Sequence, residues 1–300
     1  NESIEGIGEA FSADTDSRTR AFLKIQDGCD YKCSFCTIPL ARGRSRSLPM
    51  ERVIENARRL IDAGYKEIVL TGVNTGDYDF ENKGLIDIML NLDKLNIPRI
   101  RVSSIEPNLI TDDIIELVAS SNKFCKHFHI PLQSGDPDIL RSMRRRYGTE
   151  QYSELISKIN SRIPEAGIGV DVITGFPGET EDRFTNTFDF IDSLQISYLH
   201  VFTYSERRDT DAAMMTGRVD VSKRRGRNEI LRNLSAKKKF EFYSRFAGAE
   251  AQVLFESAKD NGTIEGYTSN YIRVRSDNAK AFANNIASVI LKNPVGRDIV

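Results

Sequence analysis

Apolar and polar residues are arranged along this chain in two different patterns. Short apolar runs, such as Glu67-Ile68-Val69-Leu70, predict buried strands. Between them lie longer stretches in which apolar residues return every three or four positions, which is the pattern of an amphipathic helix. The stretch 51–63 is an example, because its apolar residues share one helical face: Val53, Ile54, Ala57, Leu60 and Ile61.

Strands and helices of this kind follow one another in six units. The expected strands cover residues 20–26, 67–70, 99–103, 127–130, 168–173 and 198–202. The expected helices cover residues 51–63, 84–94, 111–121, 136–143 with 149–162, 180–194 and 221–246. This alternation predicts an α/β fold with a parallel sheet. Six units are too few for an eight-unit barrel, so we expect a partial (β/α)6 barrel, open on one side, whose active rim is formed by the loops after the strands.

The chain changes character after Gly248. Three short alternating runs, at 251–255, 263–267 and 271–274, predict a small all-β barrel. Residues 1–17 have little periodicity and are expected to be a linker or a fragment edge. The predicted domains are therefore the partial barrel, 18–247, and the small β-barrel, 248–300.

The composition is that of a soluble globular protein. The 300 residues include 40% hydrophobic and 28% charged residues, and the net charge is −1. No apolar run approaches the ~20 residues of a membrane span, and no signal peptide opens the chain, so we expect a cytoplasmic protein with no membrane partner. Local basic runs such as Arg144-Arg145-Arg146 still permit contact with a polyanion.

Three of the four cysteines, Cys29, Cys33 and Cys36, share one loop with the spacing C-x3-C-x2-C. Three thiolates can hold three irons of a 4Fe–4S cube and leave the fourth iron open to a small chelating molecule. Radical S-adenosylmethionine (SAM) enzymes need this arrangement. A zinc site would need a fourth ligand, which is absent at ligand spacing, and a disulfide framework would need pairs in a small secreted chain. Cys125 stands apart and is expected to be an ordinary buried or half-buried thiol.

The cysteine loop and several later segments together resemble the radical SAM methylthiotransferases. These enzymes install a methylthio group on tRNA adenosines or on one ribosomal protein. The resemblance covers nearly the whole chain and is carried, in order, by residues 24–29, 39–43, 67–72, 101–107, 129–135, 143–147 and 171–180. It implies a 4Fe–4S cluster and SAM as cofactors, and a SAM-derived radical that abstracts hydrogen from C2 of an adenine.

Three branches of that family are possible matches for this chain. The segments 20–29, 41–47 and 199–205 look most like the branch that acts on N6-threonylcarbamoyladenosine at position 37 of tRNA. The isopentenyladenosine branch usually has a glutamate where this chain has Arg44, and the ribosomal-protein branch carries a different loop there. A non-enzymatic Fe–S RNA-binding module is a further alternative, which would keep the cysteines but need no SAM pocket.

The resemblance also implies roles for individual residues. Cys29, Cys33 and Cys36 would ligate the cluster, and no catalytic residue is identified beyond them. Phe35 would lie by the SAM adenine, and Thr71, Gly72 and Val73 by its methionine amino end. The other expected SAM contacts are Glu106, Gln133, Arg144 for the SAM carboxylate, Asp171 and Gly175 for the ribose and adenine, and Tyr204 for the adenine or substrate pocket.

The C-terminal tail resembles the TRAM domain, a small RNA-binding barrel. Tyr267, Tyr271, Arg273 and Arg275 are its expected RNA contacts, because aromatic rings stack on exposed bases and arginines reach phosphates. The implied partners are a tRNA anticodon stem-loop and an electron donor such as flavodoxin or ferredoxin. Family members also carry an N-terminal domain with a second 4Fe–4S cluster. The cysteines of that domain are absent here, so the second cluster is expected only in a full-length protein.

Overall fold

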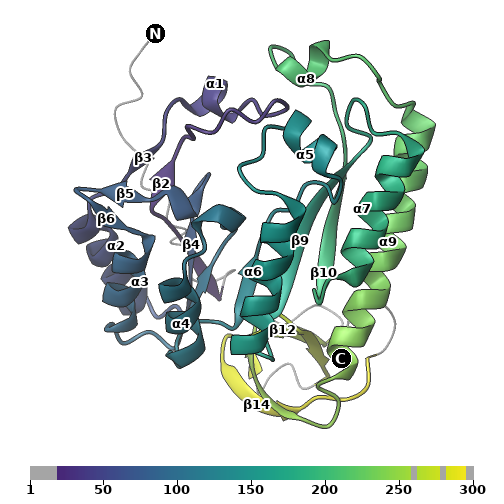
Figure 1. Cartoon of the computed structure of the whole chain (residues 1–300). Coiled ribbons are helices and arrows are strands. Elements are labelled where there is room, and N and C mark those ends of the chain that lie inside the picture. The colour runs from purple at the N-terminus through teal and green to yellow at the C-terminus, as the bar shows by residue number, and fades with distance from the viewer. Residues whose placement is uncertain (1–18, 258–261, 278–281, 295–300) are drawn as a thin grey trace.

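Six parallel strands form the centre of the protein. The computed structural model describes residues 19–257, 262–277 and 282–294 (Figure 1). The strands are β1 (Arg20–Lys24), β4 (Glu67–Thr71), β7 (Arg99–Val102), β8 (His127–His129), β9 (Gly167–Thr174) and β10 (Tyr198–Thr203). They pair as β1-β4-β7 and β8-β9-β10, and a parallel bridge between Ser104 and His129 joins the two groups. The predicted partial (β/α)6 barrel is therefore confirmed.

Helices cover the outer face of the strands (Figure 1). They are α2 (Met50–Asp62), α3 (Leu85–Asp93), α4 (Asp112–Ser120), α6 (Thr149–Arg162), α7 (Glu181–Ser193) and α9 (Val221–Ser244). Because strand side chains alternate in direction, every second residue faces these helices, and those residues are apolar. Examples from the main core are Ala21, Leu23, Ile68, Leu70, Ile100, Val102, Ile168, Val170 and Val172. Many residues between them, which face the barrel interior, are polar: Glu67, Arg101, His127, His129, Asp171 and His200.

Several short elements around the rim were not predicted. The expected strand over 20–26 is divided, because β1 ends at Lys24 and β2 (Gln26–Asp27) instead pairs with β3 (Arg46–Ser47). The other additions are α1 (Ile38–Arg42), η1 (Thr75–Asp77), the hairpin of β5 (Asp79–Phe80) with β6 (Lys83–Gly84), η2 (Pro107–Leu109) and α8 (Asp211–Met214). The predicted helical segment near 136–143 is α5 (Pro137–Ser142).

The all-β character predicted for the tail is confirmed. An antiparallel sheet with the order β13-β12-β11-β14 is formed by β11 (Glu250–Phe255), β12 (Ile264–Thr268), β13 (Arg273–Ser276) and β14 (Ile286–Ile290). Its last strand was not predicted. The sheet lies at the end of the barrel where the strands begin (Figure 1). The expected linker 1–17 lies outside the described residues, so the division into domains stays a prediction.

Arginine side chains join this tail sheet to the barrel. Arg99 donates to the Tyr267 carbonyl at 2.9 Å, and Arg101 donates to the carbonyls of Thr268 and Ser269 at 3.3 and 3.1 Å. Charged hydrogen bonds of this kind rank among the stronger ones in proteins.

Within the described part of the chain, no helix combines the length and the apolar character that crossing a membrane requires.

Candidate active site

The three clustered cysteines lie in the loop after β1, at the rim where the barrel strands end. All three are partly exposed. Burial raises the pKa of Cys29, and together with the neighbouring Cys33 and Cys36 it brings that pKa to about 11. Three mutually close thiols on one short loop are the donor set that a 4Fe–4S cluster with one open iron requires. The residues present therefore fit such a cluster.

A glycine and a short strand pair hold this cysteine loop in place. Gly28 has a φ of +70°, and a Cβ there would lie 2.0 Å from the Arg44 carbonyl oxygen, so a side chain cannot be accommodated. The Cys29 amide donates to the Gly43 carbonyl at 3.2 Å. The end of α1 thus supports the first cysteine directly.

The basic residues of this segment are engaged within the protein. Asp27, whose side chain is 6% exposed, pairs with Lys24 at 2.7 Å, Arg46 at 3.1 Å and Arg42 at 3.4 Å. Burial opposes ionisation of Asp27, but its bonds to Lys24 and the Gly28 amide outweigh burial and lower its pKa. These three basic side chains therefore help to hold the cysteine loop through Asp27.

Gln26 connects the cysteine loop to the loop after β4. Its Nε2 donates to the Gly28 carbonyl at 2.8 Å, while its Oε1 accepts from the Asn74 amide at 2.9 Å. A Cβ on Gly72 would lie 2.9 Å from the same Oε1, which explains the need for glycine there. Gln26 was not predicted from the sequence, although its position at the end of the expected strand 20–26 and just before the cysteines was a usable signal.

The loop after β4 therefore lies directly beside the cysteine loop. Thr71, Gly72 and Val73, expected to contact the methionine end of SAM, are half-buried there. The neighbouring Asn74 is 5% exposed, and neither polar atom of its side chain has a hydrogen-bond partner among the described residues. Buried polar groups are nearly always hydrogen-bonded, so this amide is available to a polar ligand group. Asn74 was also missed.

Arg145 links the cysteine loop to Glu106. Its Nη1 donates to the Cys33 Sγ at 3.2 Å, its Nη2 pairs with the Glu106 carboxylate, and its Nε donates to the Tyr147 hydroxyl at 3.0 Å. The Arg145 side chain is only 4% exposed. Burial raises the pKa of Cys33, whereas the charge of Arg145 opposes that rise. A fixed positive charge therefore faces one of the candidate cluster ligands.

The residue expected to bind the SAM carboxylate, Arg144, lies elsewhere. Its side chain is 53% exposed and pairs with Asp211 of α8 at 2.5 Å. Arg144 has a φ of +58°, so the chain turns sharply between the adjacent arginines. The structure therefore brings Arg145, and not Arg144, to Cys33 and Glu106. A run of three arginines carries no signal for which one faces inward.

An apolar wall of aromatic residues lies beside the cysteines. The Phe35 ring meets Phe176 edge-on at 6.3 Å between centroids, and Phe176 meets Tyr204 at 5.5 Å. Tyr204 is 5% exposed, and its hydroxyl has no hydrogen-bond partner within the described ranges. Phe35 and Tyr204, both assigned to the adenine pocket from the sequence, therefore belong to one cluster, which sequence reasoning could not show.

The turn after β9 is packed tightly against α9. Gly175 has a φ of +77°, and a Cβ there would lie 2.2 Å from Cγ of Arg224. The Gly175 amide donates to the buried Glu179 carboxylate at 2.9 Å, and Arg227 pairs with that carboxylate at 2.7 Å. These contacts make Gly175 part of a rigid turn next to the aromatic wall.

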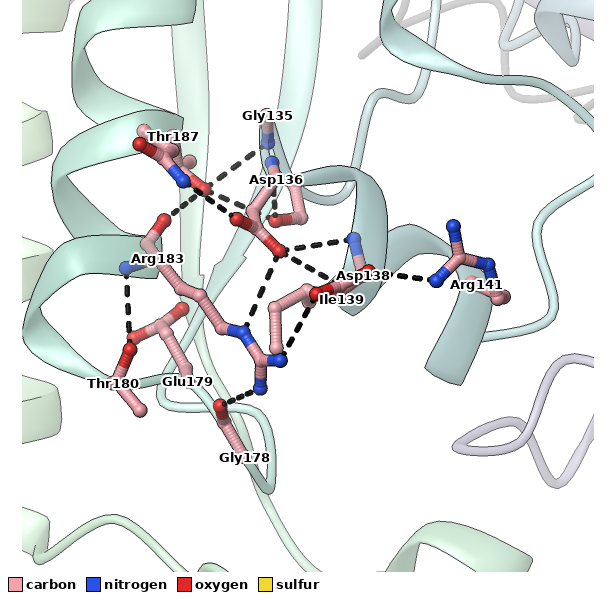
Figure 2. Close-up of polar contacts among 12 residues, drawn as sticks. Gly135, Asp136, Asp138, Ile139, Arg141, Gly178, Glu179, Thr180, Arg183 and Thr187 are labelled. Carbon is pink, nitrogen blue, oxygen red and sulfur yellow. Dashed lines mark hydrogen bonds and ion pairs between the residues drawn. The ribbon is translucent and has the colours of Figure 1, made fainter.

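A polar network holds the loops after β8 and β9 together, as Figure 2 shows. Asp136 caps the start of α5 by accepting from the Ile139 amide at 3.0 Å. Arg183 of α7 donates to the Gly178 carbonyl at 2.7 Å and to Asp138 at 3.1 Å. The rim of the barrel is therefore cross-linked by side chains on this side.

Gln133, in the loop after β8, lies beside Asp171 of β9. Gln133 has a φ of +71°, and its amide donates to the Asp171 carbonyl at 2.8 Å. The Asp171 carboxylate lies 2.7 Å from His129 Nε2, and a ligand atom of His200 lies within 4.8 Å of both. Two imidazoles and one carboxylate on three neighbouring strands could also hold a transition-metal ion. Asp171 was predicted, but both histidines were missed.

The residues expected to bind RNA lie at the opposite end of the barrel from the cysteines. The Tyr271 ring stacks on His127 at 4.5 Å and on Tyr267 at 4.8 Å, and Arg101 lies 4.8 Å above its centre. These contacts engage both tyrosine rings in packing, so they give no support to stacking on RNA bases. Two arginines complete the predicted set: Arg273, which pairs with Glu265, and Arg275, which is exposed.

Comparison with known sequences places these features in context. The family model described as "Radical SAM superfamily" matches residues 23–191. Two similar proteins are named threonylcarbamoyladenosine tRNA methylthiotransferase MtaB. The one from Bacillus subtilis is 42% identical over 86% of this chain and 59% of its own length. The one from Thermotoga maritima is 35% identical over 89% of this chain and 62% of its own length. A tRNA-2-methylthio-N(6)-dimethylallyladenosine synthase from Endomicrobium trichonymphae is 33% identical over 92% of this chain and 66% of its own. The chain thus spans about three fifths of the length of these relatives.

Solved structures resemble the barrel at low sequence identity. The radical S-adenosylmethionine methyltransferase TsrM from Kitasatospora setae superposes with a TM-score of 0.56 at 17% identity, covering 64% of this chain and 38% of its own. Coproporphyrinogen III oxidase (HemN) from Escherichia coli gives 0.55 at 14% identity, with coverages of 72% and 52%. At these identities the similarity concerns the fold alone.

Proposed function

We propose, since the chain belongs to the radical SAM superfamily, that it forms the barrel and tail of a tRNA methylthiotransferase. The proposed substrate is N6-threonylcarbamoyladenosine at position 37, and the product carries a methylthio group at C2. The observation that carries this proposal is the cysteine loop, where Arg145 joins Cys33 to Glu106 beside the Gly72 loop. The substrate is supported by the names of relatives such as the one from Bacillus subtilis.

The residues of the rim have distinct proposed tasks. When bound, a 4Fe–4S cluster and SAM supply a carbon radical by reductive cleavage of the sulfonium. Cys29, Cys33 and Cys36 would hold that cluster, and Arg145 would balance negative charge at Cys33. Glu106 offers a carboxylate to the SAM ammonium group, since opposite charges attract strongly where water is scarce.

The walls of the site would position SAM and limit side reactions. The unpartnered amide of Asn74 can hydrogen-bond to the methionine end of SAM, beside the Gly72 backbone. Phe35 and Tyr204 present an apolar surface suited to an adenine ring. A carbon radical reacts with any hydrogen donor that reaches it. A site that positions the substrate and excludes other molecules therefore favours the intended hydrogen transfer.

The partners of the whole protein follow from the same proposal. They are a tRNA anticodon stem-loop, an electron donor such as flavodoxin or ferredoxin, and a second 4Fe–4S cluster on a further domain of the full-length protein. A cytoplasmic location and a division at 248, with a TRAM-like second part, belong to the proposal as well.

A second candidate substrate is dimethylallyladenosine in tRNA. It is favoured by one observation, namely that a relative named for that substrate is 33% identical over 92% of the chain. The relatives reported above carry no name that points to the other predicted alternatives, the ribosomal-protein substrate and the non-enzymatic RNA-binding module. Release of 5′-deoxyadenosine by the reconstituted, reduced protein would exclude the non-enzymatic alternative.

Mass spectrometry of tRNA nucleosides tests the proposal directly. A strain lacking the gene should accumulate threonylcarbamoyladenosine and lose its methylthio derivative, and the full-length gene should restore it. The Cys33→Ala gene should fail to restore it. Loss of methylthio-dimethylallyladenosine instead would assign the second substrate, and an unchanged nucleoside profile would contradict both.

A further inference from the structure

Three side chains that can ligate a metal ion meet on the inner face of the barrel. His129, Asp171 and His200 belong to β8, β9 and β10, whereas the cysteine loop follows β1. One ligand atom of each lies within 4.8 Å of a ligand atom of the other two. The group contains no cysteine, so its donor atoms differ from those that a 4Fe–4S cluster requires.

The pairing of the strands brings these side chains to one face. His200 lies opposite Asp171 in the parallel pairing of β10 with β9, so both side chains point to the same side of the sheet. His129 lies opposite Gly169, which precedes Asp171 by two residues. Residues two apart on a strand share a face, so His129 points to that side as well. The geometry of the group therefore depends on the barrel strands and not on a loop.

A hydrogen bond already joins two of the three side chains. His129 Nε2 lies 2.7 Å from Asp171 Oδ1. Ligand atoms stand about 3.3 Å apart around a tetrahedral ion with bonds of about 2.0–2.1 Å. Small rotations of the three side chains would therefore let an ion take the place of the shared proton, because ligand atoms bind metals in their deprotonated form.

The group is shielded on one side and accessible on the other. The side chains of His129 and Asp171 are 24% and 18% exposed, whereas His200 is an exposed residue. Structural zinc sites have four protein ligands, but sites with three protein ligands keep a position for water or for another molecule. An ion held by these three residues would thus have an open position that is reached past His200.

We propose that His129, Asp171 and His200 form a binding site for one divalent transition-metal ion, separate from the cysteine loop. Two imidazoles and one carboxylate suit ions such as zinc, nickel or iron(II), and the carboxylate offsets part of the charge of the ion. The site gives Asp171 a task other than the ribose contact expected from the sequence. The inference does not depend on the proposed substrate, because it needs only side chains of the barrel.

The histidine count of the chain makes the site easy to test. The chain has three histidines, and the third, His127, lies 2.8 Å from the Tyr198 hydroxyl and outside the group. The test protein is the full chain with all three clustered cysteines replaced by alanine, which removes the competing thiolates. Zinc alone is added while the imidazole nitrogens are followed by NMR. We expect the signals of His129 and His200 to shift until about one zinc is bound per chain, and those of His127 to stay unchanged.

Substitutions in the same protein identify the ligands. Asp171→Asn and His200→Ala should each weaken zinc binding by roughly tenfold or more, because each removes one ligand. His127→Gln is the matched control, since it removes a histidine outside the group, and it should bind zinc as its parent does. Urea denaturation shows that each variant folds. Zinc should stabilise the parent and His127→Gln but not Asp171→Asn, because a ligand of the folded state opposes unfolding.

The remaining outcomes overturn the inference. Histidine signals that do not respond to zinc, or zinc binding that survives both ligand substitutions, would leave the bond between His129 and Asp171 as a structural contact. Equal shifts at all three histidines would indicate unspecific binding. As a second measurement, wild type with a reconstituted cluster, whose thiolates are occupied, should show the same two shifts with zinc, and their absence would count against the site.

Discussion

Arg145 donates a hydrogen bond to the Sγ of Cys33 at 3.2 Å, although the two residues are 112 positions apart in the chain. The contact joins the loop after β1 to the loop that follows α5. It brings a buried positive charge to one of three candidate cluster ligands, and the same guanidinium also holds Glu106. The contacts of one arginine, Arg145, thus connect the cysteine loop to Glu106 at the rim.

Replacing Arg145 with alanine should destabilise the protein markedly. The change leaves the Glu106 carboxylate, whose side chain is 16% exposed, without its ion-pair partner. Breaking a buried pair in this way costs about 3 kcal/mol. Arg144→Ala is the matched control, because that arginine is 53% exposed and its pair with Asp211 should contribute less than about 1 kcal/mol. Urea denaturation of both variants, without cofactors, measures the difference, and equal losses would contradict the assigned roles.

Cluster assembly should depend on the clustered cysteines and not on the fourth. Anaerobically reconstituted wild type should bind about four irons and four sulfides per chain. Cys33→Ala should bind almost none. Cys125→Ala is the control, since Cys125 is buried 3.6 Å from Glu67 at the other end of the barrel, and its iron content should be unchanged. Stoichiometric zinc without iron uptake by wild type would contradict the cluster assignment.

The barrel could be predicted from the sequence because apolar residues recur with different periods in its strands and in its helices. Alternation along β9 places Ile168, Val170 and Val172 against the helices, and this signal is local. The cysteine loop was also local, since its spacing is readable without a structure. The fold and the candidate cluster ligands could therefore be predicted from patterns within single segments.

The remaining site depends on backbone geometry that the sequence does not display. Arg144 and Arg145 are chemically identical neighbours, yet the backbone has a positive φ at Arg144 and it is Arg145 that reaches Cys33. Gln26 and Asn74 meet through a contact between residues 48 apart. In the tail, alternation predicted a β segment from Tyr271 to Val274, but Tyr271 lies in the turn before β13, with a φ of +69°, and its contacts with the barrel could not be predicted from the tail alone.

Acid should weaken the contact between the barrel and the tail sheet through Glu67. Burial opposes ionisation of Glu67, but the charges of Arg101 and Arg99 outweigh burial and lower its pKa to about 2. A carboxyl with a lowered pKa stabilises the folded state above its unfolded pKa of about 4.5 and stops doing so as the pH falls towards 2. The stabilisation should therefore be complete at pH 7 and decline below pH 4.5.

Glu67→Gln measures this contribution. At pH 7 the variant should lose about 3 kcal/mol of unfolding free energy, because two buried arginines lose their counter-charge. The loss should shrink as the pH falls from 4.5 towards 2, because over this range the unfolded wild type takes up a proton at Glu67 and the folded state does not. Glu116→Gln is the control, since Glu116 pairs with Arg162 on the exposed surface and its removal should change little at either pH. A loss that does not depend on pH would mean that the charge of Glu67 is unimportant.

Variants at Tyr271 and Arg275 should distinguish a residue that stabilises the tail from one that is free to bind RNA. Tyr271 stacks on His127 and lies under Arg101, so Tyr271→Ala removes an aromatic contact at the barrel and should cost about 3 kcal/mol. Arg275 is exposed, and Arg275→Ala should leave the unfolding free energy unchanged. Denaturation by urea compares the two variants.

The same pair of variants decides whether the tail binds RNA through its predicted residues. Arg275→Ala should weaken binding of an anticodon stem-loop and flatten its salt dependence, because a lost phosphate contact releases fewer counterions. At a temperature where it stays folded, Tyr271→Ala should keep its affinity, since its ring packs against the barrel and not outward. Titrations at two salt concentrations provide the measurement. A folded Tyr271→Ala protein with strongly reduced affinity would restore the tyrosine as an RNA contact. It would also require the tail sheet to leave the barrel when RNA binds, because the ring is otherwise held between His127 and Tyr267.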